Sequence, residues 1–265
     1  MAEGMRGSDK RISESGMHEI QHLADPADQV RYRHVQWVAA GSALTHVTAV
    51  FLAIYAFRAG DLQELSLINL MHFVPNNVAL WQVCCFAIGI SSLSFLALYI
   101  AVKQILRLRH SVWINTATFL VVIAVALDMQ SYGNLMVFFS DICVQLTRSS
   151  GYKQLLMLEG WRSVNQGLTQ SVLIGNTLYS LAGLVMAGAI VAGKGLPNWL
   201  GWTSVPIWLV GLAASGLTFA GQLSWALVLM FAMTIAFIIW TIALAVAVDP
   251  YTTSHKFPID HNPAN

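Results

Sequence analysis

Six long apolar stretches occupy most of this chain and leave few folds open to it. They cover residues 35–57, 79–102, 112–133, 168–193, 198–219 and 222–247. A helix of ~20 apolar residues is long enough to cross a hydrocarbon core of ~30 Å, and each stretch has about that length. Charged residues make up only 10% of the sequence, against about 25% in soluble domains. The sequence therefore predicts an all-α fold, a polytopic transmembrane bundle of six spans in a lipid bilayer.

Tryptophans mark the ends of these stretches. Five of them lie beside an end of an apolar stretch: Trp37, Trp81, Trp113, Trp199 and Trp225. Tryptophan collects at membrane–water interfaces because its ring is apolar and its N–H needs a polar partner. We therefore expect these side chains at the two bilayer surfaces.

Basic residues predict the orientation of the spans. The side holding both termini carries ten lysines and arginines, and the opposite side carries four. This bias favours cytoplasmic termini and an inner (plasma) membrane location. We divide the chain into a polar tail, 1–34, the membrane domain, 35–248, and a C-terminal tail, 249–265. The polar tail has no apolar signal region, so we expect the first span to direct insertion. A net charge of +1 without a basic stripe argues against nucleic acid as a partner.

Two loops on the side opposite the termini mix apolar and charged residues. Residues 58–78 and 134–167 are too polar to span a bilayer and too apolar to be simple linkers. This mixture is typical of amphipathic helices. We expect short helices that lie along the membrane surface or fold back over the mouth of the bundle.

His46 is the first candidate site residue. It lies near the middle of the first predicted span, where an ionisable group often indicates a functional site. It could ligate haem, relay a proton or contact a substrate. A neutral imidazole bonded within the bundle is the structural alternative. Bis-histidine haem ligation is disfavoured, because no second histidine lies inside a span. The sequence identifies no cofactor.

Asp128 is the second candidate, a carboxylate within the third apolar stretch. Gln82, Gln166, Gln170 and Asn176 are predicted at a similar depth in neighbouring spans. We expect an outward-facing polar vestibule, closed by the loop that holds Glu159 and Arg162, with Arg162 as the ionic partner of Asp128. The alternative is an interfacial carboxylate that is solvated or paired with Arg162. The predicted ligand-binding set comprises Asp128, Gln82, Gln170, Asn176, His46, Glu159 and Arg162.

A metal-binding pattern occurs in the N-terminal tail. His18, Glu19 and His22 match H-E-x-x-H, in which two histidines one helical turn apart bind zinc. The surrounding tail is short and polar and offers no third ligand, so a solvated helix is the preferred interpretation and no metal site is predicted. The three cysteines, Cys84, Cys85 and Cys143, are interpreted as packing residues, with a disulfide to Cys143 as the alternative.

The turn between the fourth and fifth stretches reads Gly-Leu-Pro-Asn-Trp-Leu-Gly-Trp, residues 195–202. Small residues four apart, Gly183 with Ala187 and Gly211 with Ser215, predict close packing of the two flanking helices. The turn resembles the G-L-P-x-W-L-G loop of a group of bacterial six-helix membrane proteins of unknown function. The resemblance covers residues 168–247; it implies a bacterial inner-membrane protein and assigns no catalytic residue.

Three classes of function remain open. The first is a non-enzymatic protein, either a subunit of a membrane complex or a binder of a small lipophilic molecule. The second is a transporter or channel that uses the vestibule around Asp128. The third is a membrane enzyme that acts on a lipophilic substrate through Asp128, Glu159 or His46. Motifs that announce other enzyme classes, such as a phosphate-binding glycine loop or a G-x-S-x-G elbow, are missing.

Overall fold

The computed structural model describes residues 26–59, 67–106, 111–146, 148, 150–193 and 195–253. These residues form helices and no strands, which confirms the all-α prediction. Six helical segments are long and apolar enough to cross a membrane. They are Gln29–Ala56, Val78–Ile105, Val112–Leu146, Tyr152–Ala192, Asn198–Phe219 and Leu223–Val248. The chain is a multi-pass integral membrane protein.

The observed helices closely follow the predicted stretches or extend past their ends. They are α2 (Pro26–Ala59), α3 (Leu67–Asn76), α4 (Val78–Ile105), α5 (Val112–Asn134), α6 (Ser140–Leu146), α7 (Tyr152–Gln170), α8 (Asn176–Ala192), α9 (Asn198–Phe219) and α10 (Leu223–Thr253). Two π-helical segments, η1 (Leu135–Phe139) and η2 (Ser171–Gly175), join α5 to α6 and α7 to α8. The third span therefore runs on to residue 146 rather than 133, and the fourth begins at 152 rather than 168.

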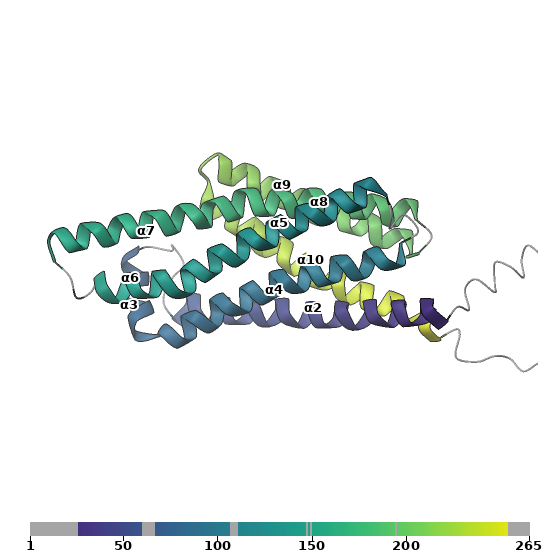
Figure 1. Cartoon of the computed structure of the whole chain (residues 1–265), viewed down its shortest axis with the longest axis horizontal. Helices are drawn as coiled ribbons and strands as arrows, with labels where there is room; N and C mark the ends of the chain where they lie inside the picture. Colours follow the sequence, from purple (N-terminus) through teal and green to yellow (C-terminus); the bar gives the residue numbers. More distant parts are fainter. Residues whose placement is uncertain are drawn as a thin grey trace, which may run out of the picture.

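The spanning helices form a closed ring. In the order α2, α4, α5, α8, α9 and α10, each helix packs on the next, and α10 packs on α2 to close the ring. The start of α2 and the end of α10 lie at the same end of the molecule (Figure 1). We call this end proximal and the opposite end distal. A ring of six helices has a central space, and how side chains fill it decides where a site can form.

Two helical segments that form the distal end are longer than a bilayer crossing requires. The continuous helix Tyr152–Ala192 has 41 residues and is about 60 Å long, twice the ~30 Å hydrocarbon thickness. The α9–α10 hairpin ends near the middle of the long axis, while α3, α6 and α7 continue past it (Figure 1). We call α3, η1, α6, α7 and the start of α4 the distal extension.

The distal extension corrects the prediction for residues 134–167. Residues 134–167 extend the two flanking helices instead of forming separate short helices, because η1 and η2 carry those helices onward without a break. The turn comes only before α7, where Gly151 has φ 61°, a left-handed conformation that favours glycine. In the other loop, α3 is the expected short amphipathic helix. It buries Leu70, Phe73 and Val74 and packs on α6.

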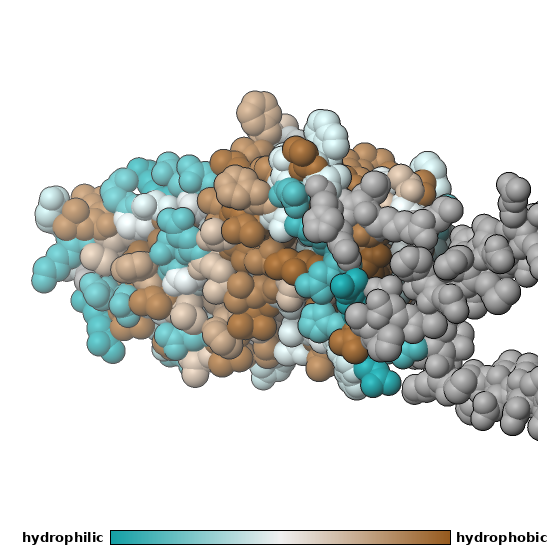
Figure 2. All heavy atoms as spheres, turned by 45° about the vertical axis from the view of Figure 1, so that its right-hand side comes forward, coloured by the Kyte–Doolittle hydropathy of each residue, from teal (hydrophilic) through white to brown (hydrophobic). Residues whose placement is uncertain are grey.

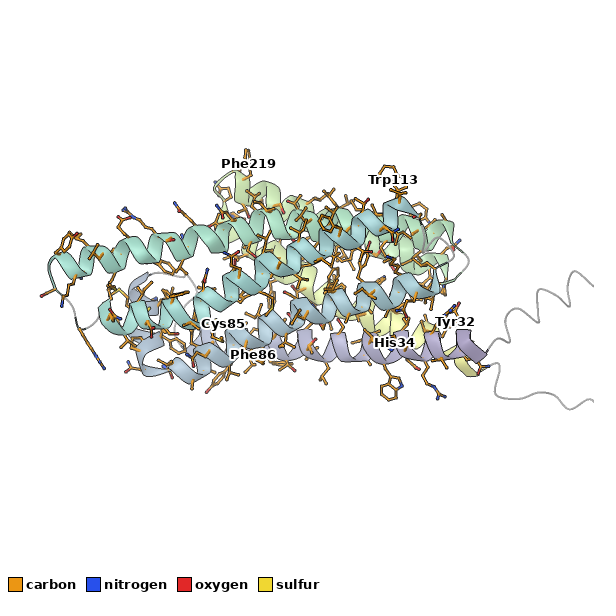
Figure 3. The ribbon with its side chains drawn as sticks, in the orientation of Figure 1. Tyr32, His34, Cys85, Phe86, Trp113 and Phe219 are labelled. Carbon is orange, nitrogen blue, oxygen red and sulfur yellow. The ribbon has the colours of Figure 1, made fainter. Side chains whose placement is uncertain are left out.

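The outer surface matches a membrane-embedded body. An apolar band crosses the middle of the molecule between more hydrophilic ends (Figure 2). Trp113 and Phe219 point away from the bundle at two levels along its long axis (Figure 3), and their side chains are 75% and 82% exposed. Trp81 differs from these two residues because it lies inside the protein rather than on its outer surface. This residue is buried in the distal extension, where its Nε1 donates to the Leu135 carbonyl at 2.9 Å.

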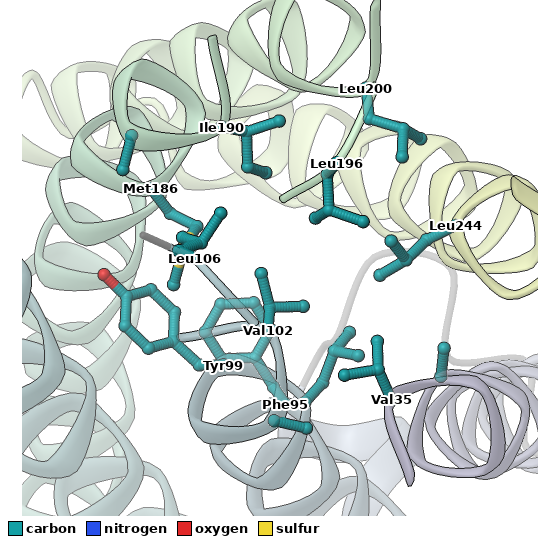
Figure 4. Packing of buried hydrophobic residues seen from close by; sticks show 14 of the residues in the cluster. Val35, Phe95, Tyr99, Val102, Leu106, Met186, Ile190, Leu196, Leu200 and Leu244 are labelled. Atoms are coloured by element: carbon teal, nitrogen blue, oxygen red, sulfur yellow. The ribbon is translucent and has the colours of Figure 1, made fainter. Parts of the chain in front are cut away.

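Apolar side chains fill the proximal half of the ring. Phe95, Tyr99, Val102, Leu106 and Met186 are buried there, together with residues from α9 and α10 (Figure 4). The predicted close packing of α8 on α9 is confirmed. A Cβ at Gly183 would strike the Trp208 ring, and one at Gly201 would lie 2.7 Å from the Ala187 carbonyl oxygen.

The turn at residues 195–197 packs against the proximal apolar core. A Cβ at Gly195 would collide with the carbonyl oxygen of Ile105, so only glycine fits this close approach. The Tyr32 hydroxyl donates to the Gly195 carbonyl at 3.0 Å, and Leu196 is buried. The packing of this turn therefore explains its glycine and its buried leucine without reference to the sequence resemblance.

A second apolar core holds the distal extension together. Phe139 is completely buried between Trp81 and Trp161, with ring centroids 5.6 and 4.7 Å away. Cys84, Cys85 and Cys143 belong to the same region, and all of them are buried free thiols. Their structural role is packing, as the sequence interpretation has it.

Candidate functional site

Asp128 is the centre of a hydrogen-bond network contributed by three helical segments. Ser92 on α4 and Tyr179 on α8 donate to its Oδ2 at 2.8 and 2.9 Å. Ser171 in η2 donates to its Oδ1 at 2.6 Å. Hydrogen bonds to an ionised acceptor are short and strong, so three converging hydroxyls hold the carboxylate in one orientation. Asp128 lies about 24 Å along α5 from Val112 at its proximal start, in the distal part of this helix.

The π-helical segment η2 shapes this network. It begins at Ser171 and ends at Gly175, and both residues face Asp128. A Cβ on Gly175 would lie 3.5 Å from Asp128 Oδ1, so the backbone of η2 passes close to the carboxylate. π-Helical turns inside α-helices often occur at functional sites because they redirect side chains without ending the helix. Here the turn brings a hydroxyl donor directly to the carboxylate.

A cavity of about 250 Å³ lies beside Asp128, in the central space of the ring. All six ring helices contribute to its wall, including Ala49 on α2, Ile88 on α4, Tyr132 on α5, Trp208 on α9 and Thr234 on α10. Most of the wall is apolar. Phe231 lines the cavity and is 44% exposed, so α10 forms the rim where the cavity comes nearest to the outside of the bundle.

His46 lines the same cavity from α2. Its Nδ1 lies 2.8 Å from the carbonyl oxygen of Ser42, one turn earlier on the helix, and its ring packs on Phe237 with centroids 5.0 Å apart. A carbonyl oxygen only accepts, so Nδ1 carries the proton of the neutral imidazole and Nε2 is left as an acceptor. His46 thus places a polar group on the α2 wall of the cavity.

Asn176 is the third predicted residue on the cavity wall. Its Nδ2 donates to the Gly211 carbonyl at 2.7 Å and to Ser215 Oγ at 3.1 Å. These bonds tie α8 to α9 directly beneath η2. The structure therefore brings Asp128, His46 and Asn176 together around one space.

The other predicted residues lie elsewhere. Gln82 is in the distal extension, where its Nε2 donates to the Met136 carbonyl at 3.5 Å. Gln170 precedes Ser171 but is exposed, because its side chain points away from the bundle. The predicted ion pair between Arg162 and Asp128 is not formed. Arg162 Nη1 instead donates to Glu159 Oε1 at 2.6 Å, on the exposed surface of α7.

Sequence reasoning missed Ser92, Ser171 and Tyr179, the three donors to Asp128. Serine and tyrosine within apolar stretches give only a weak signal, because they also bond to their own helix or sit at interfaces. The depth estimate added a larger error. It assumed that α4 begins at the membrane surface, whereas its first turns belong to the distal extension. The residue level with Asp128 is therefore Ser92, about 15 Å farther along α4 than Gln82.

The pattern His18-Glu19-Ile20-Gln21-His22 lies outside the described residues. Within the part of the chain that the structure describes, no group of three or more histidine, cysteine or acidic side chains is arranged to hold a metal ion. The candidate site is a half-buried hydrogen-bond network around Asp128, beside a mostly apolar cavity.

No family model, curated protein or solved structure matches this chain. The class that the fold and the site define is a six-span membrane protein with an internal cavity that Asp128 lines. Its function has to be argued from these features alone.

Proposed function

We propose that this protein binds a small lipophilic molecule inside the ring of helices, as a non-enzymatic membrane binding protein. The observation that carries this proposal is the distribution of polarity around the cavity. Most of the wall is apolar, and its polar groups are the Asp128 network, His46, Asn176, Tyr132 and two hydroxyls, those of Ser91 and Thr234, that donate to carbonyls of their own helices. Ligand sites in proteins are typically apolar pockets with a few fixed polar groups that orient the ligand.

The size of the cavity limits the ligand. Drug-sized molecules occupy pockets of ~300–1,000 Å³, and this cavity of about 250 Å³ lies just below that range. Burial of an apolar body would supply the affinity, at about 25 cal/mol per Å² removed from water. The polar groups would select the ligand by its head group.

The packing of the ring favours binding over conduction. Proximal to the cavity, Val102, Leu106, Ile190, Leu200 and Leu244 are almost completely buried in one apolar cluster. Among the described residues this cluster occupies the space that a channel would need (Figure 4). The cavity is therefore closed toward the proximal side and fits a binding site better than an open pore.

The proposal is tested by filling the cavity. Ala49 is buried and lines the cavity from α2, so Ala49→Phe should place a ring in the ligand volume. We expect a small molecule to co-purify with the wild-type protein in a roughly equimolar amount. This molecule should be absent from the purified Ala49→Phe variant. Solvent extraction and mass spectrometry of protein purified from native membranes measure it.

Leu44→Phe is the matched control. Leu44 lies on the same helix, is 67% exposed and is not on the cavity wall. This variant should keep the bound molecule. The proposal fails if no molecule accompanies the wild-type protein, or if Ala49→Phe retains as much of it as Leu44→Phe does.

We also propose that the protein lies in a bacterial inner membrane with both termini in the cytoplasm. The ten-to-four distribution of basic residues supports this orientation. Reporter fusions at residues 110 and 196 should then read cytoplasmic, and fusions at 66 and 150 should read external. The opposite pattern would reverse the orientation and place the distal extension inside the cell.

A further inference from the structure

We propose that the ligand of this cavity is an organic ammonium ion with an apolar body, whose positive charge lies at Asp128. This inference rests on the proposed function and specifies its ligand class. The first argument is charge. Ser92, Ser171 and Tyr179 supply hydroxyl donors to the carboxylate, and a hydroxyl carries no compensating charge. Among the described residues that line the cavity, none is lysine or arginine.

The lack of a positively charged partner for Asp128 among the described residues has a larger energetic effect inside a membrane than in water. A carboxylate within a bundle is stabilised mainly by a partner of opposite charge, because the surroundings screen weakly. The carboxylate can accept about four hydrogen bonds, and the three hydroxyls leave room for one further donor. An ammonium group at the cavity side of Asp128 would supply both the charge and that donor.

The second argument is the aromatic composition of the wall. Tyr179, which bonds Asp128, has its ring 5.1 Å from that of Phe95. Phe95 lies 5.3 Å from Phe237, and Phe237 lies 5.0 Å from His46. These contacts connect Tyr179, which bonds the carboxylate, to the His46 imidazole through two phenylalanine rings, and all four side chains line the cavity. Aromatic faces attract organic cations, most strongly where water is excluded.

The third argument is the acceptor at His46. His46 Nδ1 is engaged with the Ser42 carbonyl, so Nε2 is the ring nitrogen left for a ligand. The site thus combines a negatively charged group at Asp128, an aromatic wall and a neutral hydrogen-bond acceptor at His46 Nε2. A molecule with a cationic head, an apolar body and a distant hydroxyl or amide would match all three.

The test compares two molecules of the same shape. 2-Phenylethylammonium, which is protonated at neutral pH, and propylbenzene differ in a charged, hydrogen-bonding nitrogen in place of the terminal methyl carbon. Binding of each to the full-length protein in phosphatidylglycerol nanodiscs is measured by titration. We expect the ammonium compound to bind at least ten-fold more tightly. Asp128→Asn should remove this preference, and Asp141→Asn, at an exposed position on α6, should leave it unchanged.

The outcomes separate this inference from the function it rests on. Equal binding of the two compounds, or a preference that survives Asp128→Asn, overturns the ammonium inference and leaves a neutral lipophilic ligand. Binding of neither compound overturns both proposals. Addition of phosphatidylethanolamine to the nanodiscs distinguishes the natural source: weaker binding identifies a lipid head group as the competing ammonium, and unchanged binding identifies a free amine.

Discussion

Replacement of Asp128 by leucine should lower the free energy of unfolding by about 2–4 kcal/mol and abolish ligand binding. The variant leaves the hydroxyls of Ser92, Ser171 and Tyr179 without their common acceptor, and each buried group that loses its partner costs about 1–3 kcal/mol. The two serines can turn to carbonyls of their own helices, so Tyr179 contributes most of the loss. Reversible unfolding in mixed micelles measures the effect.

Two variants bracket this result. Asp128→Asn keeps an acceptor oxygen without the charge, so it should cost about 1 kcal/mol in stability while still impairing binding. Asp141→Leu changes an exposed carboxylate of α6 and should leave both properties unchanged. If Asp128→Leu is as stable as the wild type and binds ligand normally, Asp128 is an interfacial anchor and the site is elsewhere.

Replacement of Phe139 by alanine should have an equally large effect, confined to the distal extension. Phe139 is completely buried between Trp81 and Trp161, and truncation of such a ring costs about 3–5 kcal/mol. Hydrogen exchange should accelerate in α6 and α7, whereas the proximal half of the ring keeps its protection. The neighbouring residue provides a matched control.

Phe138 adjoins Phe139 in η1 and is 61% exposed. Phe138→Ala should change stability by less than about 0.5 kcal/mol. Equal effects of the two substitutions would mean that η1 does not hold Phe139 inward, and that the distal extension lacks the second core described above.

The spans could be predicted from the sequence because a bilayer imposes one dominant requirement, a run of apolar residues of fixed length. The α9 prediction, 198–219, coincides with the observed helix for this reason. The distal extension could not be predicted in the same way. Outside the hydrocarbon core, a helix continues or ends according to local turns and packing, and neither Gly133 nor Asn134 stops α5 before η1.

The candidate site was predicted in part. A carboxylate in an apolar stretch is costly unless it has partners, so Asp128 could be recognised from its type and position alone. Its partners could not be identified, because helix register and depth determine which side chain meets it. Because the depth of α4 was wrong by ten residues, Gln82 was predicted where Ser92 is found. Gln170 is exposed, whereas the next residue in the chain, Ser171, donates to Asp128.

A density map of the full-length protein, purified with its native lipids, tests the central claim most directly. We predict density for a bound molecule in the cavity, in contact with Asp128 at one end and against the rings of Phe95 and Phe237 along its length. An Asp128 side chain that points to the lipid head groups, or a cavity filled by the protein's own side chains, would contradict it.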